Sequence, residues 1–191
     1  LTDTKVPRLS TIDPLTGKEI EERKSYVLYP AKHYMTDPKS HQEVFVKIRH
    51  DLESQIKFFK DRGKLIEAQR ISERVNFDLE MITEMGFVNG IENYSRYFDG
   101  RKSGDPPYTL LDYYQEKYGS KWLLFIDESH MTLPQIRGMY QGDRSRKQTL
   151  IDFGFRLPAA LDNRPLKFDE FSRRISNTVY VSATPNTWEI S

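Results

Sequence analysis

The stretch Trp122–His130, WLLFIDESH, joins five apolar residues to four polar ones, two of which are acidic. A second stretch, Val179–Pro185 (VYVSATP), changes in the same way from strand-forming residues to two hydroxyl residues. Short runs of this kind are typical of strands buried on both faces of a parallel sheet. We therefore expect two neighbouring parallel strands with a shared polar cluster, because ligands bind at the carboxyl ends of such strands.

Asp127 and Glu128 form the acidic part of this cluster, and Ser182 and Thr184 form its hydroxyl part. Adjacent carboxylates suit a nucleotide site, because the first can hold Mg²⁺ through its water shell and the second can polarise an attacking water. A single acidic pair more often only ends a strand and starts a turn. The second strand with its two hydroxyls favours the functional interpretation.

Four further segments make the interpretation more specific: residues 90–96 (GIENYSR), 106–113 (PPYTLLDY), 133–140 (LPQIRGMY) and 154–165 (GFRLPAALDNRP). Together with the DESH and SATP sequences, they resemble the UvrB family of helicase-like, damage-verifying subunits of bacterial nucleotide excision repair. The resemblance runs from about Ile12 to Pro185. The first ten residues fit it less well.

The resemblance implies an α/β fold. Its parts would be a partial RecA-like (P-loop NTPase/helicase) parallel sheet, a helical hairpin, an α-rich insertion and the remnant of an N-terminal β-hairpin. The expected domains are 1–30, the end of a UvrA-interaction β domain; 31–100, RecA-like helices and a loop; 101–120, the first part of the insertion; 121–135, the strand with DESH; 136–174, the DNA-facing second part of the insertion; and 175–191, the strand with SATP.

The resemblance also assigns roles at the strand ends. Asp127 would hold Mg²⁺, Glu128 would activate water, and His130 would couple the nucleotide site to Ser182 and Thr184, which relay the nucleotide state to DNA. ATP and Mg²⁺ are the cofactors expected for an intact family member. The sequence has no Gly-x-x-x-x-Gly-Lys-Ser/Thr loop to hold phosphates. We therefore interpret the chain as an internal fragment that binds no cofactor and does not hydrolyse ATP by itself.

The segment from Arg137 to Arg174 has a different chemistry, with nine Lys and Arg residues against five acids and several aromatic residues between them. Cations neutralise phosphates and exposed rings stack on bases, so the mixture suits a single-strand path. A small helical subdomain with a core and a solvated face would have the same composition. The resemblance favours DNA, and the expected DNA-contact residues are Phe87, Glu92, Tyr94, Arg96, Arg144, Phe155 and Arg156. Of these, Phe87, Phe155 and Arg156 are expected to form a pocket for an extruded base.

The segments before residue 86 predict local structure more than chemistry. Residues 1 to about 30 are expected to be β, with a turn at Asp13–Gly17. Apolar residues at helical spacing predict two helices between about Ser40 and Met85, with Gly63 between them. The apolar positions of the two helices are Phe45, Ile48, Leu52, Ile56 and Phe59, then Leu65, Ala68, Ile71, Val75, Leu79 and Ile82.

Composition agrees with a soluble protein of a reducing compartment, the cytoplasm, because the 191 residues include no cysteine and no run long enough to span a membrane. The resemblance implies damaged DNA, UvrA and UvrC as partners, and no membrane. The alternative is a non-catalytic module, residues 1–85, that binds UvrA. A transcription-repair coupling factor shares a UvrA-binding domain with the family, but residues 90–95 and 154–161 argue against it.

Overall fold

The computed structural model of the chain describes residues 6–27 and 38–187, the second range with side chains from residue 42 onward. The chain divides into two compact units, residues 1–33 and 34–191, and each is described by itself. The elements in chain order are β1 (Ser10–Ile12), β2 (Glu19–Glu22), α1 (Pro38–Lys60), α2 (Leu65–Met85), the 3-10 helix η1 (Ile91–Tyr94), α3 (Ser95–Phe98), α4 (Leu110–Tyr118), β3 (Leu123–Ile126), α5 (Ser129–Asp152), the 3-10 helix η2 (Pro158–Asp162), α6 (Phe168–Arg174) and β4 (Asn177–Tyr180).

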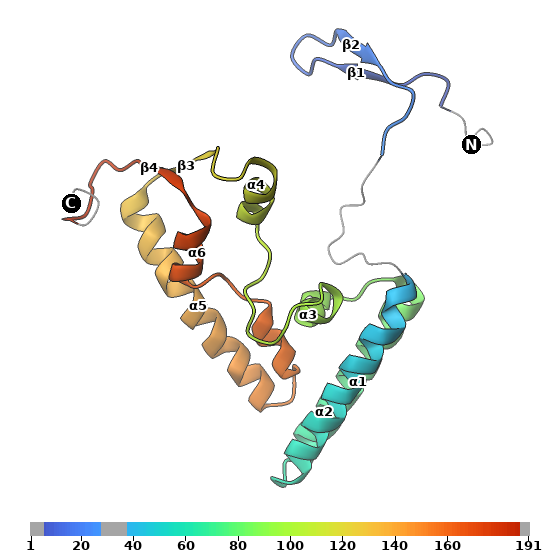
Figure 1. The fold of residues 1–191 in the computed structure, drawn as a ribbon. Coiled ribbons are helices and arrows are strands. Elements are labelled where there is room, and N and C mark those ends of the chain that lie inside the picture. Colours follow the sequence, from blue (N-terminus) through green and yellow to red (C-terminus); the bar gives the residue numbers. More distant parts are fainter. Residues whose placement is uncertain (1–5, 28–37, 188–191) are drawn as a thin grey trace. The chain divides into compact units, whose positions relative to one another are not determined.

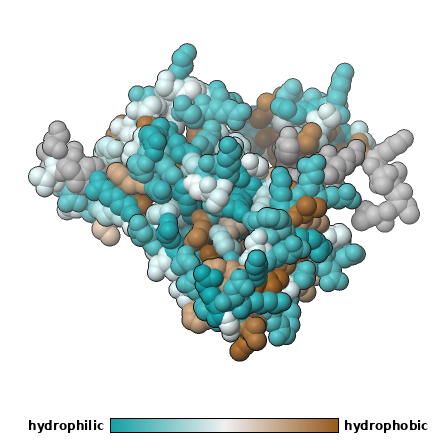
Figure 2. Space-filling view, turned by 60° about the horizontal axis from the view of Figure 1, so that its bottom comes forward, coloured by the Kyte–Doolittle hydropathy of each residue, from teal (hydrophilic) through white to brown (hydrophobic). Residues whose placement is uncertain are grey.

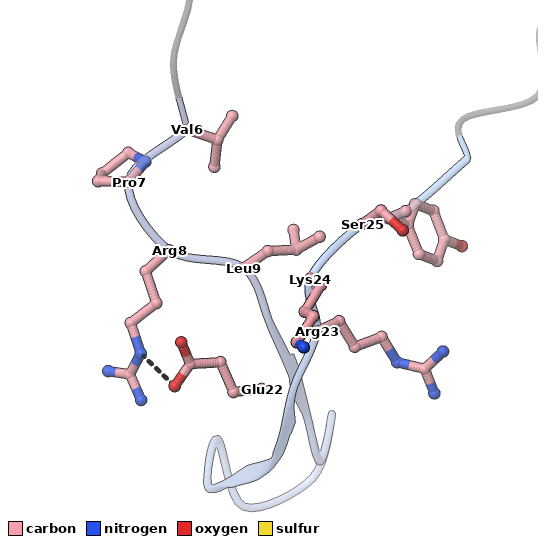
Figure 3. A pocket seen from close by; sticks show the side chains of 9 residues that line it. Val6, Pro7, Arg8, Leu9, Glu22, Arg23, Lys24 and Ser25 are labelled. Atoms are coloured by element: carbon pink, nitrogen blue, oxygen red, sulfur yellow. Dashed lines mark ion pairs between the residues drawn. The ribbon is translucent and has the colours of Figure 1, made fainter.

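The first unit is a β-hairpin. β1 and β2 pair antiparallel, with Ser10 opposite Glu22. The Asp13 carboxylate accepts a hydrogen bond from the Leu15 N–H at 2.8 Å, and Gly17 has a φ of 67°. The predicted turn is therefore confirmed. The β prediction for residues 1–30 is confirmed at the two strands, while residues 1–5 and 28–30 lie outside the described part. Figure 3 shows the open end of this hairpin, where Arg8 pairs with Glu22.

The second unit begins with the helical hairpin of α1 and α2, which lie side by side (Figure 1). The predicted apolar stripe is largely confirmed, because its central members Ile48, Phe59, Ile71 and Val75 are completely buried. Leu65 is an exception and is 65% exposed, since it opens α2 rather than lying along its packed face. Residues Tyr94, Tyr97, Leu157 and Ala159 belong to the same core, so the hairpin packs against α3 and η2.

β3 and β4 form the predicted pair of adjacent parallel strands, with Phe125 opposite Val179. A second core covers one face of this pair; it contains Ile126, Leu133, Leu166 and Phe171. In the described ranges the sheet that holds these two runs has two strands. The parallel pairing is thus confirmed, whereas the RecA-like part of the fold prediction stays an expectation.

The prediction that both faces of these strands are buried is wrong. Leu123 and Phe125 are 52% and 63% exposed, and Val179 and Val181 are also exposed. Side chains alternate along a strand, so Leu124 and Ile126 point to the covered face and their neighbours to the open one. The apolar run is typical of a strand with other elements packed on both faces, but in the described residues only one face of the strand pair is packed against a core. Figure 2 shows hydrophobic residues (brown) among hydrophilic ones (teal) on the face in view.

The insertion is rich in helix, as predicted, and α5 is its longest element. This helix is continuous from Ser129 to Asp152. It therefore crosses the domain boundary that the sequence predicts between residues 135 and 136. The domain boundaries themselves stay predictions. In the part of the chain that the structure describes, no helix combines the length and apolar character needed to cross a bilayer.

Candidate functional site

The polar residues at the ends of β3 and β4 meet, as their positions in the sequence predicted. The Nδ1 atom of His130 lies 2.7 Å from the Oγ atom of Ser182. The same Oγ accepts a hydrogen bond from the Thr184 N–H at 3.2 Å. The Glu128 carboxylate lies 3.4 Å from His130 Nδ1. One histidine therefore contacts both the acidic segment and the hydroxyl segment.

The backbone holds the two strand ends together beyond the ladder. The Ser129 N–H donates to the Val181 carbonyl at 3.0 Å, and the Ser129 hydroxyl lies within 3.3 Å of the same oxygen. Ser129 is completely buried. Glu128, just before it, has a φ of 45°, which is an unfavourable conformation for a residue with a Cβ and recurs at functional sites. The contacts between Ser129 and Val181 thus fix the turn in which Asp127 and Glu128 are exposed.

Asp127 and Glu128 are both exposed, and one Asp127 oxygen accepts the Glu128 N–H at 2.9 Å. Mg²⁺ prefers oxygen ligands and uses only one or two protein carboxylates when phosphates and waters complete its shell. The Asp127 carboxylate, with its other oxygen not committed to that bond, fits such a role.

A separate pocket of about 410 Å³ brings together four of the seven predicted DNA-contact residues: Glu92, Tyr94, Phe155 and Arg156. They come from η1 and from the loop after α5, which are about 60 residues apart in the sequence. Volumes of about 300–1,000 Å³ are usual for small-ligand pockets. We call this cavity the aromatic pocket; its other lining residues are Arg74, Asp78, Asn89, Gly90, Asn93, Leu150 and Leu157.

Phe155 is held at the pocket by contacts with α2. The Arg70 guanidinium lies 4.4 Å from the centre of the Phe155 ring, while the ring remains 50% exposed. Gly154 has a φ of 71°, and a Cβ at this position would lie 2.5 Å from the Glu67 carbonyl oxygen. Only glycine lets the loop approach α2 so closely. One face of the ring is therefore fixed by a cation, and part of the ring stays open to solvent.

Tyr94 and Asp78 form a buried polar contact at the pocket. The Tyr94 hydroxyl donates to the Asp78 carboxylate at 2.7 Å, and Arg74 pairs with the same carboxylate at 3.0 Å. Burial raises the pKa of Asp78, and burial together with the neighbouring carboxylate raises the pKa of Tyr94. The phenol thus stays protonated and serves as a hydrogen-bond donor. Tyr94 is 4% exposed, so its contacts favour a role in building the pocket.

The remaining predicted DNA-contact residues lie outside the pocket lining. The Arg96 guanidinium bridges Asp51 at 2.6 Å and Asp162 at 2.9 Å, which ties α1 to η2 and favours a structural role. Phe87 is 37% exposed. Arg144 lies in a different hollow, on α5. The structure therefore joins Phe155 with Arg156 but not with Phe87.

Sequence reasoning missed four polar residues of the aromatic pocket, Arg74, Asp78, Asn89 and Asn93. A signal for Asp78 was present, because it lies three residues after Val75 and one before Leu79, on the apolar side of α2. An acidic residue at such a position needs partners, and Arg74 is one turn before it. Asn93 gave no comparable signal.

Comparison with known proteins relates the chain to one family. Residues 39–100 match the family model "UvrB third helical domain". The chain is 51% identical over 185 residues to UvrABC system protein B of Synechococcus sp. (strain JA-3-3Ab), covering 97% of this chain and 26% of that protein. It is 50% identical over 186 residues to UvrABC system protein B of Thermus thermophilus, covering 97% of this chain and 27% of that protein.

The fold and the site thus define an α/β protein with a polar cluster at the ends of two parallel strands and a separate aromatic pocket. The chain belongs to the UvrB family. It spans about a quarter of the length of the curated relatives it matches.

Proposed function

We propose that the chain is part of a UvrB-type protein that recognises and verifies DNA damage in bacterial nucleotide excision repair. The name UvrABC system protein B of its relatives supports the pathway. The observation that carries the proposal is the aromatic pocket, because it gathers Glu92, Phe155 and Arg156 around a space of about 410 Å³.

The pocket has the chemistry needed to hold an extruded nucleobase. A base would stack on the exposed part of the Phe155 ring, which Arg70 fixes in place. Stacking on an aromatic side chain contributes about 1–3 kcal/mol per base and tolerates any base. Arg156 would contact the phosphate of the extruded nucleotide. Glu92 and Asn93 would accept hydrogen bonds from base amino groups.

The strand ends would serve the nucleotide of the complete protein. Asp127 would hold Mg²⁺. The metal would neutralise the negative charge of the phosphates of bound ATP. Glu128 would accept a proton from the attacking water. His130 would couple this carboxylate to Ser182 and Thr184, a role supported by its distances of 3.4 Å to Glu128 and 2.7 Å to Ser182. A phosphate-binding loop is not encoded in the 191 residues, so this role belongs to a longer protein.

Fluorescence of 2-aminopurine tests the base pocket. An oligonucleotide with 2-aminopurine at an unpaired position should change in fluorescence when the chain binds and the base stacks on Phe155. Phe155→Leu keeps apolar volume but removes the aromatic face, and it should lose most of this signal. An unchanged signal in Phe155→Leu would contradict the proposal.

A second function, binding of UvrA through residues 1–85, is favoured by one observation. Strand β2 is exposed along its whole length, and Ile12, Leu15 and Ile20 are exposed apolar residues. Such a hairpin is marginal alone and suits docking on another protein. A pull-down with UvrA tests it, and a pull-down with UvrC tests the other implied partner. Retention of UvrA after deletion of residues 1–33 would contradict a role of the hairpin in this function.

A further inference from the structure

A second hollow, of about 480 Å³, lies between α5 and the start of α6. Three cationic side chains, two aromatic rings and one amide line it: Arg137, Arg144, Lys167, Tyr140, Phe168 and Gln141. No carboxylate is among these lining residues. We call it the basic hollow.

The rings of the basic hollow hold its cations in place. The Arg137 guanidinium lies 4.5 Å from the centre of the Phe168 ring, and the Lys167 ammonium lies 5.3 Å from the centre of the Tyr140 ring. Arg144 donates a hydrogen bond to the Tyr140 hydroxyl at 3.1 Å. Cation–aromatic contacts of this kind are favourable even at the surface. They restrict long side chains that would otherwise lose conformational freedom when they bind a ligand.

The carboxylates near the hollow are already neutralised by other cations. Asp143 pairs with Lys147 at 2.7 Å and with Arg146 at 3.1 Å. Glu170 pairs with Arg164 at 2.7 Å, and this contact lowers the pKa of Glu170 to about 2. Both acids are therefore paired with cations outside the hollow, and the positive charge of Arg144 and Lys167 is available to a ligand.

We propose that the basic hollow binds the phosphate backbone of single-stranded nucleic acid, as a subsite separate from the aromatic pocket. The ligand is phosphate rather than a base because three cations and no carboxylate line the hollow, and because the Tyr140 and Phe168 side chains are less exposed than Phe155. The inference rests on the proposed function, since it assigns to the same strand a second point of contact. It adds Arg137 and Lys167 to the predicted Arg144 and gives all three a sequence-independent role.

Salt dependence of binding tests the subsite. Each phosphate contact on a single strand contributes about 0.7 to the slope of log K against log salt concentration. The double variant Arg144→Gln/Lys167→Gln should therefore show a slope shallower by about 1.4, and a loss of about 25-fold at about 0.1 M salt that vanishes near 1 M. Fluorescence anisotropy of the full chain with a labelled oligonucleotide gives both values.

Matched controls are available on the same two helices. Arg146 on α5 and Arg173 on α6 are exposed cations outside the hollow, paired with Asp143 and Asp169. Arg146→Gln/Arg173→Gln removes the same charge and should leave the slope within about 0.3 of the unchanged chain. Equal changes in both double variants would mean a general charge effect and would overturn the subsite.

An abasic oligonucleotide separates the subsite from the base pocket. The Arg144→Gln/Lys167→Gln loss should be the same on abasic and ordinary strands, whereas Phe155→Ala should weaken only the ordinary strand. If Phe155→Ala acts as expected but the basic-hollow variant binds like the unchanged chain, the further inference fails and the proposed function stands. No binding of either strand by the unchanged, folded chain would overturn both.

Discussion

The imidazole Nδ1 of His130 lies 2.7 Å from the hydroxyl oxygen of Ser182, although 52 residues separate them. The contact joins the end of β3 to the end of β4 on the side where Asp127 and Glu128 are exposed. The Ser182 Oγ also accepts a hydrogen bond from the Thr184 N–H, so the contacts continue from His130 to Thr184.

Ser182→Ala should uncouple DNA from nucleotide turnover when the chain is placed in a full-length UvrB context. The variant removes the hydroxyl that both His130 and Thr184 contact. The ratio of ATPase rate with DNA to the rate without DNA should fall toward one. Ser172→Ala is the control, because its exposed hydroxyl only donates to the Phe168 carbonyl of its own helix. A normal ratio in Ser182→Ala would show that the contact carries no signal.

Glu128→Gln, in the same context, should retain nucleotide binding and lose most turnover. The amide keeps the shape of the side chain but cannot accept a proton, and loss of a general base reduces rates by about 10²–10⁴-fold. Equilibrium binding of a fluorescent nucleotide and steady-state ATPase measure the two properties separately. Turnover within a fewfold of the parent would remove Glu128 from the proposed chemistry.

Gly154→Ala should destabilise the second unit and displace Phe155. A residue with a Cβ is strained at the φ of 71°, and the Cβ would lie 2.5 Å from the Glu67 carbonyl oxygen. We expect a loss of at least about 1–3 kcal/mol in the free energy of unfolding, the scale of one strained residue. Gly142→Ala on α5 is the control, because nothing lies within 4 Å of its Cβ position. That change should stabilise the helix by roughly 0.5–1 kcal/mol. Chemical denaturation measures both, and equal stability of the two variants would contradict the close approach.

The Arg164–Glu170 pair should make stability depend on acid pH. The hydrogen bonds that Arg164 donates to Glu170 lower the pKa of Glu170 from 4.5 to about 2 in the folded chain. The stabilisation is therefore complete above about pH 4.5 and is lost as the pH falls toward about 2. Glu170→Gln should be less stable at neutral pH and should lose less stability over that interval.

Asp169→Asn is the matched control for this pH dependence, because its partner Arg173 is exposed and exposed pairs contribute little. Thermal melts between pH 6 and pH 3 measure the effect. If Glu170→Gln and the parent chain lose stability in parallel, the buried pair is not the source of the acid sensitivity.

Much of the local structure could be predicted because it depends on nearby residues. The turn at Asp13, the hairpin around Gly63 and the two strands that precede Asp127 and Ser182 all follow from short-range patterns. The exposure of Leu123 and Phe125 could not be predicted. An apolar run shows that a strand can be buried on both faces, but it does not show which elements pack on each face.

Several residues of the candidate site could be predicted from the sequence, but which of them lie together in the folded chain could not. The resemblance to the UvrB family pointed to Phe155 and Arg156 as DNA-contact residues. The contact of Phe155 with Arg70 joins residues 85 positions apart and has no periodic signal in the sequence. Arg96 stood out for the same reasons as Arg156, yet two carboxylates distant in sequence, Asp51 and Asp162, engage it. Only the contacts in the folded chain distinguish Arg96, which pairs with two carboxylates, from Arg156, which lines the aromatic pocket.

The affinity of Phe155→Ala for single-stranded DNA, measured beside Phe153→Ala, tests the account most directly. The two rings are two residues apart and similarly exposed, at 50% and 53%, but only Phe155 lines the aromatic pocket. The account predicts that Phe155→Ala weakens binding by about 1–3 kcal/mol, the contribution of one stacked base, and that Phe153→Ala leaves it nearly unchanged. Equal affinities for the two variants, with a lower melting temperature for Phe155→Ala alone, would contradict it and make Phe155 a packing residue.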